Sequence, residues 1–177
     1  MTAPELPPDD KDWTWVLRER CPECGFDAST VDPAAVGPSL RRHVAAWRRV
    51  LGRADATRRR RPDRWSDIEY ACHVRDVFTV FAARIDRMLA EAPARFEDWD
   101  QDAAAVEGRY AEADPAEVAR ELGVAADRLA AALARVDAGS WGRRGLRSNG
   151  SEFTVGSLTR YALHDLEHHL VDVGADL

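Results

Sequence analysis

The sequence has few of the residues that mark secreted, membrane-bound or strand-rich proteins. Only three of its 177 residues are cysteines, so a fold held together by disulfides is not expected. No apolar run approaches the roughly 20 residues that a membrane-spanning helix needs. The first 11 residues are polar and proline-rich, without the apolar core of a signal peptide. We therefore expect a cytoplasmic protein that does not bind membranes.

Glycine, proline and runs of β-branched residues are also sparse within the long segments, which favours helices. The net charge of −6 argues against general affinity for nucleic acid, because that affinity depends on counterion release at a basic surface. Arginines occupy all of positions 58–61, and in this acidic chain we interpret them as a solvated loop. A chain of 177 residues with 45% hydrophobic residues is typical of one globular domain.

Capping residues and apolar periodicity predict four long helices. Each begins after a polar capping residue and ends near a glycine or proline, and their expected ranges are 33–51, 67–91, 115–136 and 155–173. The first of them has a Gly-Pro pair at positions 37 and 38, where it could restart. A short helix is expected within residues 103–113, and a hairpin between Trp141 and Phe153, around a turn at residues 148–151.

These elements predict an all-α protein, namely a four-helix bundle with one or two short extra helices and a short N-terminal arm. The arm is expected to comprise residues 1–32 and the bundle residues 33–177, as a single domain.

Histidines are concentrated in the last expected helix. His164 and His168 lie four residues apart, so they share a helix face with Cβ atoms about 5–6 Å apart. Two imidazoles at that distance can hold one metal ion. The alternative is that both are exposed surface histidines. His169 points nearer the leucine-rich face and is a weaker ligand candidate.

A third ligand is expected from His73, at the edge of the apolar stripe of the second helix. Three neutral imidazoles suit zinc, nickel, iron or copper rather than magnesium or calcium, and they leave a coordination position open. The carboxylates Glu69, Asp76 and Asp165 are candidates to orient the imidazole rings. His43 stands alone on an amphipathic helix and is interpreted as a surface residue.

Cys21 and Cys24 have the spacing of half a zinc knuckle or of a redox pair. A structural zinc site needs four ligands, and the sequence contains no second Cys-x-x-Cys. We therefore favour a structural or incidental role, with a zinc or redox pair as the alternative. Cys72 is interpreted as a small packing residue of the second helix.

Two motifs lie on the second and the last expected helices, namely Trp65-Ser66-x-x-Glu69-x-x-x-His73 and His164-Asp165-x-x-His168-His169. Together they resemble the DinB-like superfamily, which includes the mycothiol-dependent maleylpyruvate isomerases and related thiol S-transferases. The resemblance covers roughly residues 38–173 and leaves out the cysteine segment. It implies a four-helix bundle.

The resemblance also implies a divalent metal bound by one residue of the second helix and two of the last. Carried over to this sequence, the ligands are His73, His164 and His168. Some members have Glu at the first position of the terminal pair, where this sequence has His164. Zinc is the expected metal and nickel the alternative. The family often forms dimers, so a homodimer is a further expectation.

A metal with an open position can bind a thiol and lower its pKa, which produces a nucleophilic thiolate. The resemblance implies a low-molecular-weight thiol, such as mycothiol, as cofactor. We therefore expect a metal-dependent thiol S-transferase or isomerase that acts on a small electrophile. The alternatives are a metal-dependent hydrolase and a bundle that binds metal and a small ligand without turnover. Tyr161 and Trp99 are candidate contacts to that ligand.

Overall fold

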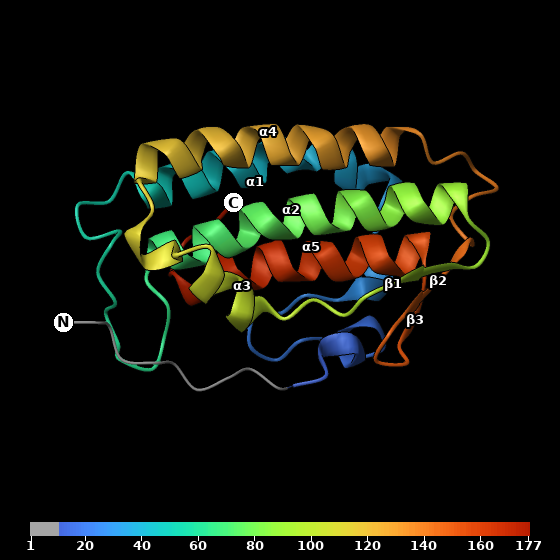
Figure 1. The fold of residues 1–177 in the computed structure, drawn as a ribbon, viewed down its shortest axis with the longest axis horizontal. Helices are drawn as coiled ribbons and strands as arrows, with labels where there is room; N and C mark the ends of the chain where they lie inside the picture. Colours follow the sequence, from blue (N-terminus) through green and yellow to red (C-terminus); the bar gives the residue numbers. More distant parts are fainter. Residues whose placement is uncertain (1–10) are drawn as a thin grey trace.

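A computed structural model describes residues 11–177, and its main body is a bundle of four long helices (Figure 1). They are α1 (Val36–Leu51), α2 (Asp67–Ala90), α4 (Pro115–Ala134) and α5 (Val155–Asp172). α4 packs against α1 and α2, and α5 packs against the same two helices. Their inward faces share one hydrophobic core, which includes Trp47, Phe78, Leu122 and Leu166. The predicted four-helix bundle is therefore confirmed.

The long helices begin at the side chains that the sequence indicates. Ser66 and Glu69 form a capping box at the start of α2, and the Asp114 carboxylate accepts a hydrogen bond from the Glu117 amide at the start of α4. Thr154 caps α5 in the same way. α1 differs from expectation, because it follows directly from the short 3-10 helix η3 (Pro33–Ala35) and does not restart at position 38. A proline is tolerated there because it lies in the first helical turn.

A small sheet lies at one end of the bundle, so the protein is not purely α-helical. Its strands are β1 (Ala94–Phe96), β2 (Arg144–Arg147) and β3 (Glu152–Thr154), in the order β1-β2-β3. β2 and β3 form the expected hairpin, and Gly150 takes the positive φ of 94° that its turn requires. β1 was not expected, because a strand of three residues is too short to show an alternating pattern. It forms by parallel pairing with β2, a partner distant in the chain.

Several short elements complete the described part of the chain. The expected short helix is split into α3 (Gln101–Glu107) and the 3-10 helix η4 (Tyr110–Glu112), because Arg109 has a positive φ of 49°. The arm contains the 3-10 helices η1 (Trp13–Leu17) and η2 (Ala28–Thr30), which pack against α5. Among residues 11–177, no helix is both long and apolar enough to cross a membrane.

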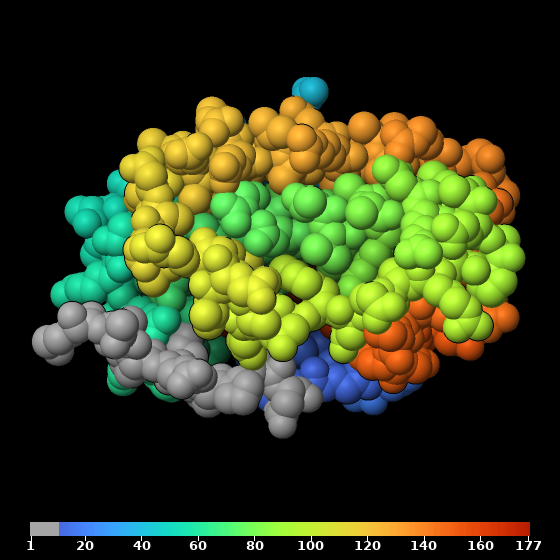
Figure 2. All heavy atoms as spheres, in the orientation of Figure 1, coloured from blue at the N-terminus to red at the C-terminus, as the bar shows by residue number. Residues whose placement is uncertain are grey.

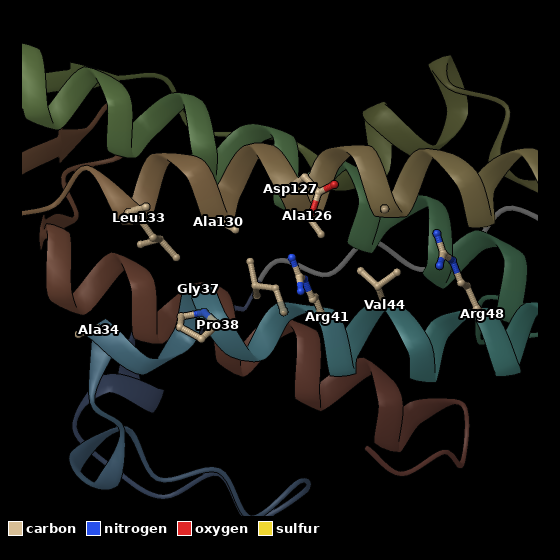
Figure 3. Close-up of a pocket in the computed structure, with 13 residues that line it drawn as sticks. Ala34, Gly37, Pro38, Arg41, Val44, Arg48, Ala126, Asp127, Ala130 and Leu133 are labelled. Carbon is tan, nitrogen blue, oxygen red and sulfur yellow. The ribbon is translucent and has the colours of Figure 1, made fainter.

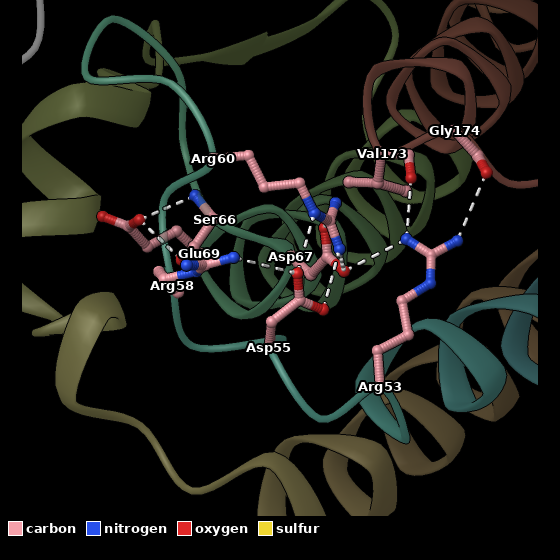
Figure 4. Close-up of polar contacts among 9 residues, drawn as sticks. All are labelled: Arg53, Asp55, Arg58, Arg60, Ser66, Asp67, Glu69, Val173 and Gly174. Atoms are coloured by element: carbon pink, nitrogen blue, oxygen red, sulfur yellow. Dashed lines mark hydrogen bonds and ion pairs between the residues drawn. The ribbon is translucent and has the colours of Figure 1, made fainter.

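Ion pairs between arginines and a buried carboxylate fix the start of α2 against the end of α5 (Figure 4). Asp67 is almost fully buried, and its carboxylate lies 3.1 Å from Arg53 and 2.8 Å from Arg60. Arg53 also donates hydrogen bonds to the carbonyl oxygens of Val173 and Gly174, just beyond α5. The expected solvated arginine loop therefore includes two residues that partner buried carboxylates, Arg60 with Asp67 and Arg59 with Glu69. The contacts of Asp67 and Arg53 hold the start of α2 beside the end of α5.

His43 departs from its interpretation as a surface residue. Its side chain is 1% exposed, and its Nδ1 donates a hydrogen bond to the carbonyl oxygen of Ser39 at 3.2 Å. Its other ring nitrogen, Nε2, lies 3.6 Å from a carboxylate oxygen of Glu167 on α5. The surface interpretation is wrong because α5 covers this side of α1, which the periodicity of one helix cannot reveal.

Candidate metal centres

Among residues 11–177, two clusters of side chains that could bind a metal ion lie on neighbouring flanks of α5. In each cluster, one ligand atom from every residue lies within 4.8 Å of the others, and the clusters are Cys21, Cys24, His164 and His168, and His73, Asp165 and His169. Consecutive residues of a helix point about 100° apart. Positions 164 and 168 therefore face the N-terminal arm, while positions 165 and 169 face α2.

The structure does not bring His73, His164 and His168 into one group. His164 and His168 do lie side by side, with ring centroids 5.0 Å apart. His73 lies instead against His169, with ring centroids 4.9 Å apart. The physical reason is the orientation of α5 about its axis. The face of α5 that packs against α2 carries Asp165 and His169, not His164 and His168. Asp165 and His169 thus lie beside His73, where His164 and His168 were expected.

The cluster of His73, Asp165 and His169 converges on one carboxylate oxygen. The Nε2 atoms of His73 and His169 both lie 3.1 Å from Oδ1 of Asp165. The His73 side chain is fully buried, whereas the side chains of Asp165 and His169 are 20% and 17% exposed. Two nitrogen donors and one oxygen donor therefore meet in a cluster of which two side chains are partly exposed, and three protein ligands would leave a coordination position open, as in catalytic metal sites.

Asp172 orients the ring of His169. Its carboxylate lies 2.8 Å from Nδ1 of His169, which leaves Nε2 directed toward Asp165. Carboxylates commonly hold metal-binding histidines in this way. Burial would lower the pKa of His169, but its hydrogen bonds to Asp165 and Asp172 raise that pKa to about 9. Burial would likewise raise the pKa of Asp165, but His73 and His169 hold it far below its usual range.

Aromatic side chains line this cluster. Trp99 stacks on His73, with ring centroids 5.3 Å apart and planes 9° apart, and Trp65 lies 5.4 Å from the same ring. The ring of Tyr70 lies 5.0 Å from that of His169. Trp99 belongs to the connector between β1 and α3, which runs alongside α5 (Figure 1). In the space-filling view, the atoms of this connector and of neighbouring elements leave little of α5 visible on this face (Figure 2). Trp99 is therefore placed to contact a ligand bound at the cluster.

Tyr161 lies one helical turn before Asp165, on the same flank of α5. Its ring packs against Phe81 and Phe153, at centroid distances of 6.0 and 5.6 Å. Burial and the charge of Asp165 raise the pKa of Tyr161 to about 12. The phenol therefore keeps its proton at neutral pH and can donate a hydrogen bond.

The second cluster joins the arm to α5. Cys21 is fully buried, Cys24 is half-buried, and both are free thiols. Sγ of Cys21 lies 3.8 Å from Nδ1 of His168. Burial raises the pKa of Cys24 to about 11 and lowers that of His164 to about 4. The sequence contains both halves of this cluster, a Cys-x-x-Cys and a His-x-x-x-His. They are far apart in the chain, so the sequence alone does not show that they lie together.

A groove of about 730 Å³ lies between α1 and α4, apart from both clusters (Figure 3). Arg41 and Asp127 extend into it, and its lining contains neither histidine nor cysteine. Cys72 belongs to neither cluster and is fully buried in the core, as a packing residue would be. The metal-ligating chemistry of the described residues is thus gathered around α5.

Comparisons with known proteins relate the chain to one family. The sequence matches the DinB superfamily over residues 39–172. YfiT from Bacillus subtilis, described as a probable metal-dependent hydrolase with an unusual four-helix bundle topology, superposes with a TM-score of 0.66 and 17% identity. That match covers 78% of this chain and 81% of YfiT. No curated protein matches the sequence.

A second solved structure, the mycothiol-dependent maleylpyruvate isomerase, superposes with a TM-score of 0.63 and 12% identity. The match covers 85% of this chain but only 64% of the isomerase, so the chain spans under two thirds of that protein. At such low identities, both likenesses show the fold alone.

Proposed function

The chain belongs to the DinB superfamily, and from this premise we propose that it is a metal-dependent enzyme with its centre at His73, Asp165 and His169. One observation carries the proposal, namely that Nε2 of a fully buried histidine and Nε2 of a second histidine both lie 3.1 Å from one carboxylate oxygen. One ligand from the second helix and two from the last is also the distribution that the family resemblance implies.

The three residues fit a divalent transition metal. Two imidazole nitrogens and one carboxylate oxygen form the donor set of many catalytic zinc sites, and they leave a position open. The nitrogen donors disfavour magnesium and calcium. We propose zinc, with nickel as the alternative. When bound, such an ion supplies Lewis acidity, which lowers the pKa of a coordinated thiol or water.

The surrounding side chains would position the ligands and the substrate. Asp172 keeps Nε2 of His169 directed at the centre, through its contact of 2.8 Å to Nδ1. The rings of Trp99 and Trp65 both pack against His73 and would limit the access of water. Tyr161, whose phenol is protonated at neutral pH, would donate a hydrogen bond to the substrate.

The reaction proposed first is thiol-dependent transfer or isomerisation, with a small electrophile as substrate and a low-molecular-weight thiol such as mycothiol as cofactor. The shared fold with the mycothiol-dependent maleylpyruvate isomerase supports this choice. Hydrolysis is the second candidate, and the shared fold with YfiT supports it. The match covers 81% of YfiT but 64% of the isomerase. In both reactions the nucleophile is a small molecule rather than a protein side chain.

Metal content and turnover test the proposal together. Asp165→Asn and His73→Ala should each lose metal at this centre and reduce turnover about 100-fold or more. The loss should be at least this large because each variant removes a residue that binds the metal directly, and loss of a residue that only orients a ligand already costs about 10- to 100-fold. The assay combines a panel of small thiols with small electrophiles, and tests esters and amides without thiol. Asp127→Asn, in the groove between α1 and α4, is the matched control.

Two results would contradict the proposal. Full metal content and turnover in both variants would remove these residues from the centre. Saturable binding of thiol and electrophile without product would identify a binding protein instead of an enzyme.

A further inference from the structure

We propose that the protein carries a second, structural metal site, in which Cys21, Cys24, His164 and His168 bind one zinc ion. One ligand atom from each of these residues lies within 4.8 Å of the others. Two thiols and two imidazoles are the Cys2His2 donor set of closed, four-coordinate zinc sites. The site shares no residue with the centre proposed above, and it fastens the N-terminal arm to α5.

The loop that carries the cysteines is folded to present both sulfur atoms to one side. The Cys21 amide donates a hydrogen bond to the Phe26 carbonyl, and the Gly25 amide donates one to the Cys21 carbonyl, each at 2.8 Å. Gly25 has a φ of 79°, which a residue with a side chain rarely adopts. This turn brings Cys24 back beside Cys21, as in a zinc knuckle.

His164 and His168 each have one nitrogen atom without an oxygen or nitrogen partner. Nε2 of His164 is buried without a hydrogen-bond partner, and leaving a buried polar atom unpaired is unfavourable. Nδ1 of His168 lies 3.8 Å from the Cys21 sulfur. Nε2 of His168 lies 3.7 Å from a carboxylate oxygen of Glu23, which favours a proton on that atom. Nδ1 is thereby left as the nitrogen that faces the thiols.

Aromatic rings close the site against solvent. Trp13 lies over both histidines, with ring centroids 5.8 Å from His164 and 5.0 Å from His168. Phe26 packs edge-on against His164 at 5.3 Å. With four protein donors and little exposed surface, the site has no position for a substrate, and its function is structural rather than catalytic.

A disulfide between the two cysteines is the competing chemistry. It would need a two-electron oxidant, and it would leave the buried nitrogen of His164 without a partner. Zinc binding needs no oxidant, because Zn²⁺ displaces one proton from each thiol into solvent and the two thiolates become ligands. Only the metal uses all four side chains.

Cobalt substitution tests the site without a variant. The wild-type chain is reduced, stripped with a chelator, and reloaded with Zn²⁺ or Co²⁺. We expect a zinc content of two ions per chain, one for each cluster. With Co²⁺ we expect the intense charge-transfer absorption of a thiolate–cobalt bond. A cobalt spectrum without thiolate absorption would overturn the proposal, and a disulfide formed under air would then explain the cysteine pair.

Matched variants assign the absorption to its residues. Cys21→Ser combined with Cys24→Ser should lose one zinc per chain and the thiolate absorption. Cys72→Ala removes a buried thiol that belongs to α2 and to neither cluster, so it should retain both zinc ions and the thiolate absorption. His73→Ala should also retain the thiolate absorption, so failure of the catalytic proposal is distinguishable from failure of this one. Loss of the absorption in Cys72→Ala, or its persistence in the double variant, would contradict the assignment.

Stability provides a readout that is independent of spectroscopy. In the His73→Ala background, removal of the remaining zinc should lower Tm by on the order of 10 °C, since the ion binds only the folded arm. The same treatment should leave Tm unchanged when Cys21 and Cys24 are also serine. An unchanged Tm in His73→Ala, once metal analysis shows that the ion has left, would rule out a structural role.

Discussion

Asp172 determines which nitrogen of His169 faces the metal centre, because its carboxylate lies 2.8 Å from Nδ1. It also lies 3.4 Å from Arg64, so its own position is held by an ion pair. A single carboxylate outside the ligand set thus sets the geometry of a ligand inside it. Its contribution can be measured apart from that of the ligands themselves.

Asp172→Asn should weaken metal binding at the His73 centre about 10- to 100-fold, because the amide no longer fixes the tautomer and charge of His169. The affinity is measured by competition with a chromophoric chelator, in a chain whose Cys21 and Cys24 are serine so that one site remains. Asp127→Asn in the same background should bind metal as before. An affinity unchanged by Asp172→Asn would show that the ring is held by packing alone.

Glu69 gives the start of α2 a dependence on pH. Burial would raise its pKa, but hydrogen bonds from Arg59 and Ser66 outweigh burial and lower it. A carboxyl group whose pKa is lower in the folded state stabilises the protein above its unfolded pKa of about 4.3, and that stabilisation is lost as the pH falls through the folded pKa. The stabilisation is therefore complete at neutral pH and disappears in acid.

Glu69→Gln should lower the free energy of unfolding by about 1–2 kcal/mol at neutral pH, because it removes the charge that pairs with Arg59. The glutamine amide oxygen can still accept the capping hydrogen bond from the Ser66 amide, so the variant isolates the charge. The difference from wild type should shrink as the pH falls below about 4. Urea unfolding of both chains at several pH values measures this. A difference that stays constant with pH would mean that the carboxylate charge has no part in the effect.

At the scale of elements, the sheet depends on close contact between β2 and its neighbours. A Cβ atom at Gly145 would lie 2.6 Å from a ring carbon of Phe96 and 2.9 Å from the sulfur of Met88. The absence of a side chain at this position lets β2 pack against β1 and the end of α2. Gly142, two residues before β2, has no atom within 4 Å of the corresponding position.

Gly145→Val should therefore destabilise the protein by about 1–3 kcal/mol through overpacking, whereas Gly142→Ala should be close to neutral. Urea unfolding measures both. The metal content of Gly145→Val should equal that of wild type, because the sheet supplies no ligand. Equal destabilisation by the two variants would indicate a backbone effect instead of a packing effect.

Elements defined by local contacts are predictable from the sequence, whereas elements defined by distant contacts are not. Helix starts were predictable because caps such as Ser66 and Thr154 act within one turn of their own helix. β1 was not, because it forms by pairing with β2, which lies far along the chain. The motif His-Asp-x-x-His-His contains two overlapping pairs at the same spacing, 164 with 168 and 165 with 169. The packing of α2 and of the arm against α5 decides that positions 165 and 169 lie with His73 and positions 164 and 168 with the cysteines.

At the scale of the whole molecule, the arm shares its core with the bundle. Val16 is fully buried, and Cys21, Phe26 and Ala28 belong to the same hydrophobic cluster as the long helices. The sequence assigned residues 1–32 to an arm and 33–177 to the bundle. The shared cluster leads us to expect that residues 11–32 and the bundle unfold as one cooperative unit.

Val16→Ala should then lower the stability of the whole chain by about 1–3 kcal/mol, through loss of buried methyl groups. Helix content is followed by circular dichroism, and the arm by the fluorine NMR signals of Trp13 and Trp15 in fluorotryptophan-labelled protein, because the other tryptophans lie outside the arm. Both transitions should shift together. Separate midpoints, with only the fluorine transition shifted, would show that the arm unfolds independently of the bundle.

The two proposed metal sites on α5 would differ in net charge once each holds a divalent ion. Two thiolates and two neutral imidazoles cancel the charge of a divalent ion, so the site under the arm has no net charge. One carboxylate and two imidazoles leave one positive charge uncancelled at the site facing α2. A single helix would thus present two adjacent ions, of which only the one facing α2 attracts anions.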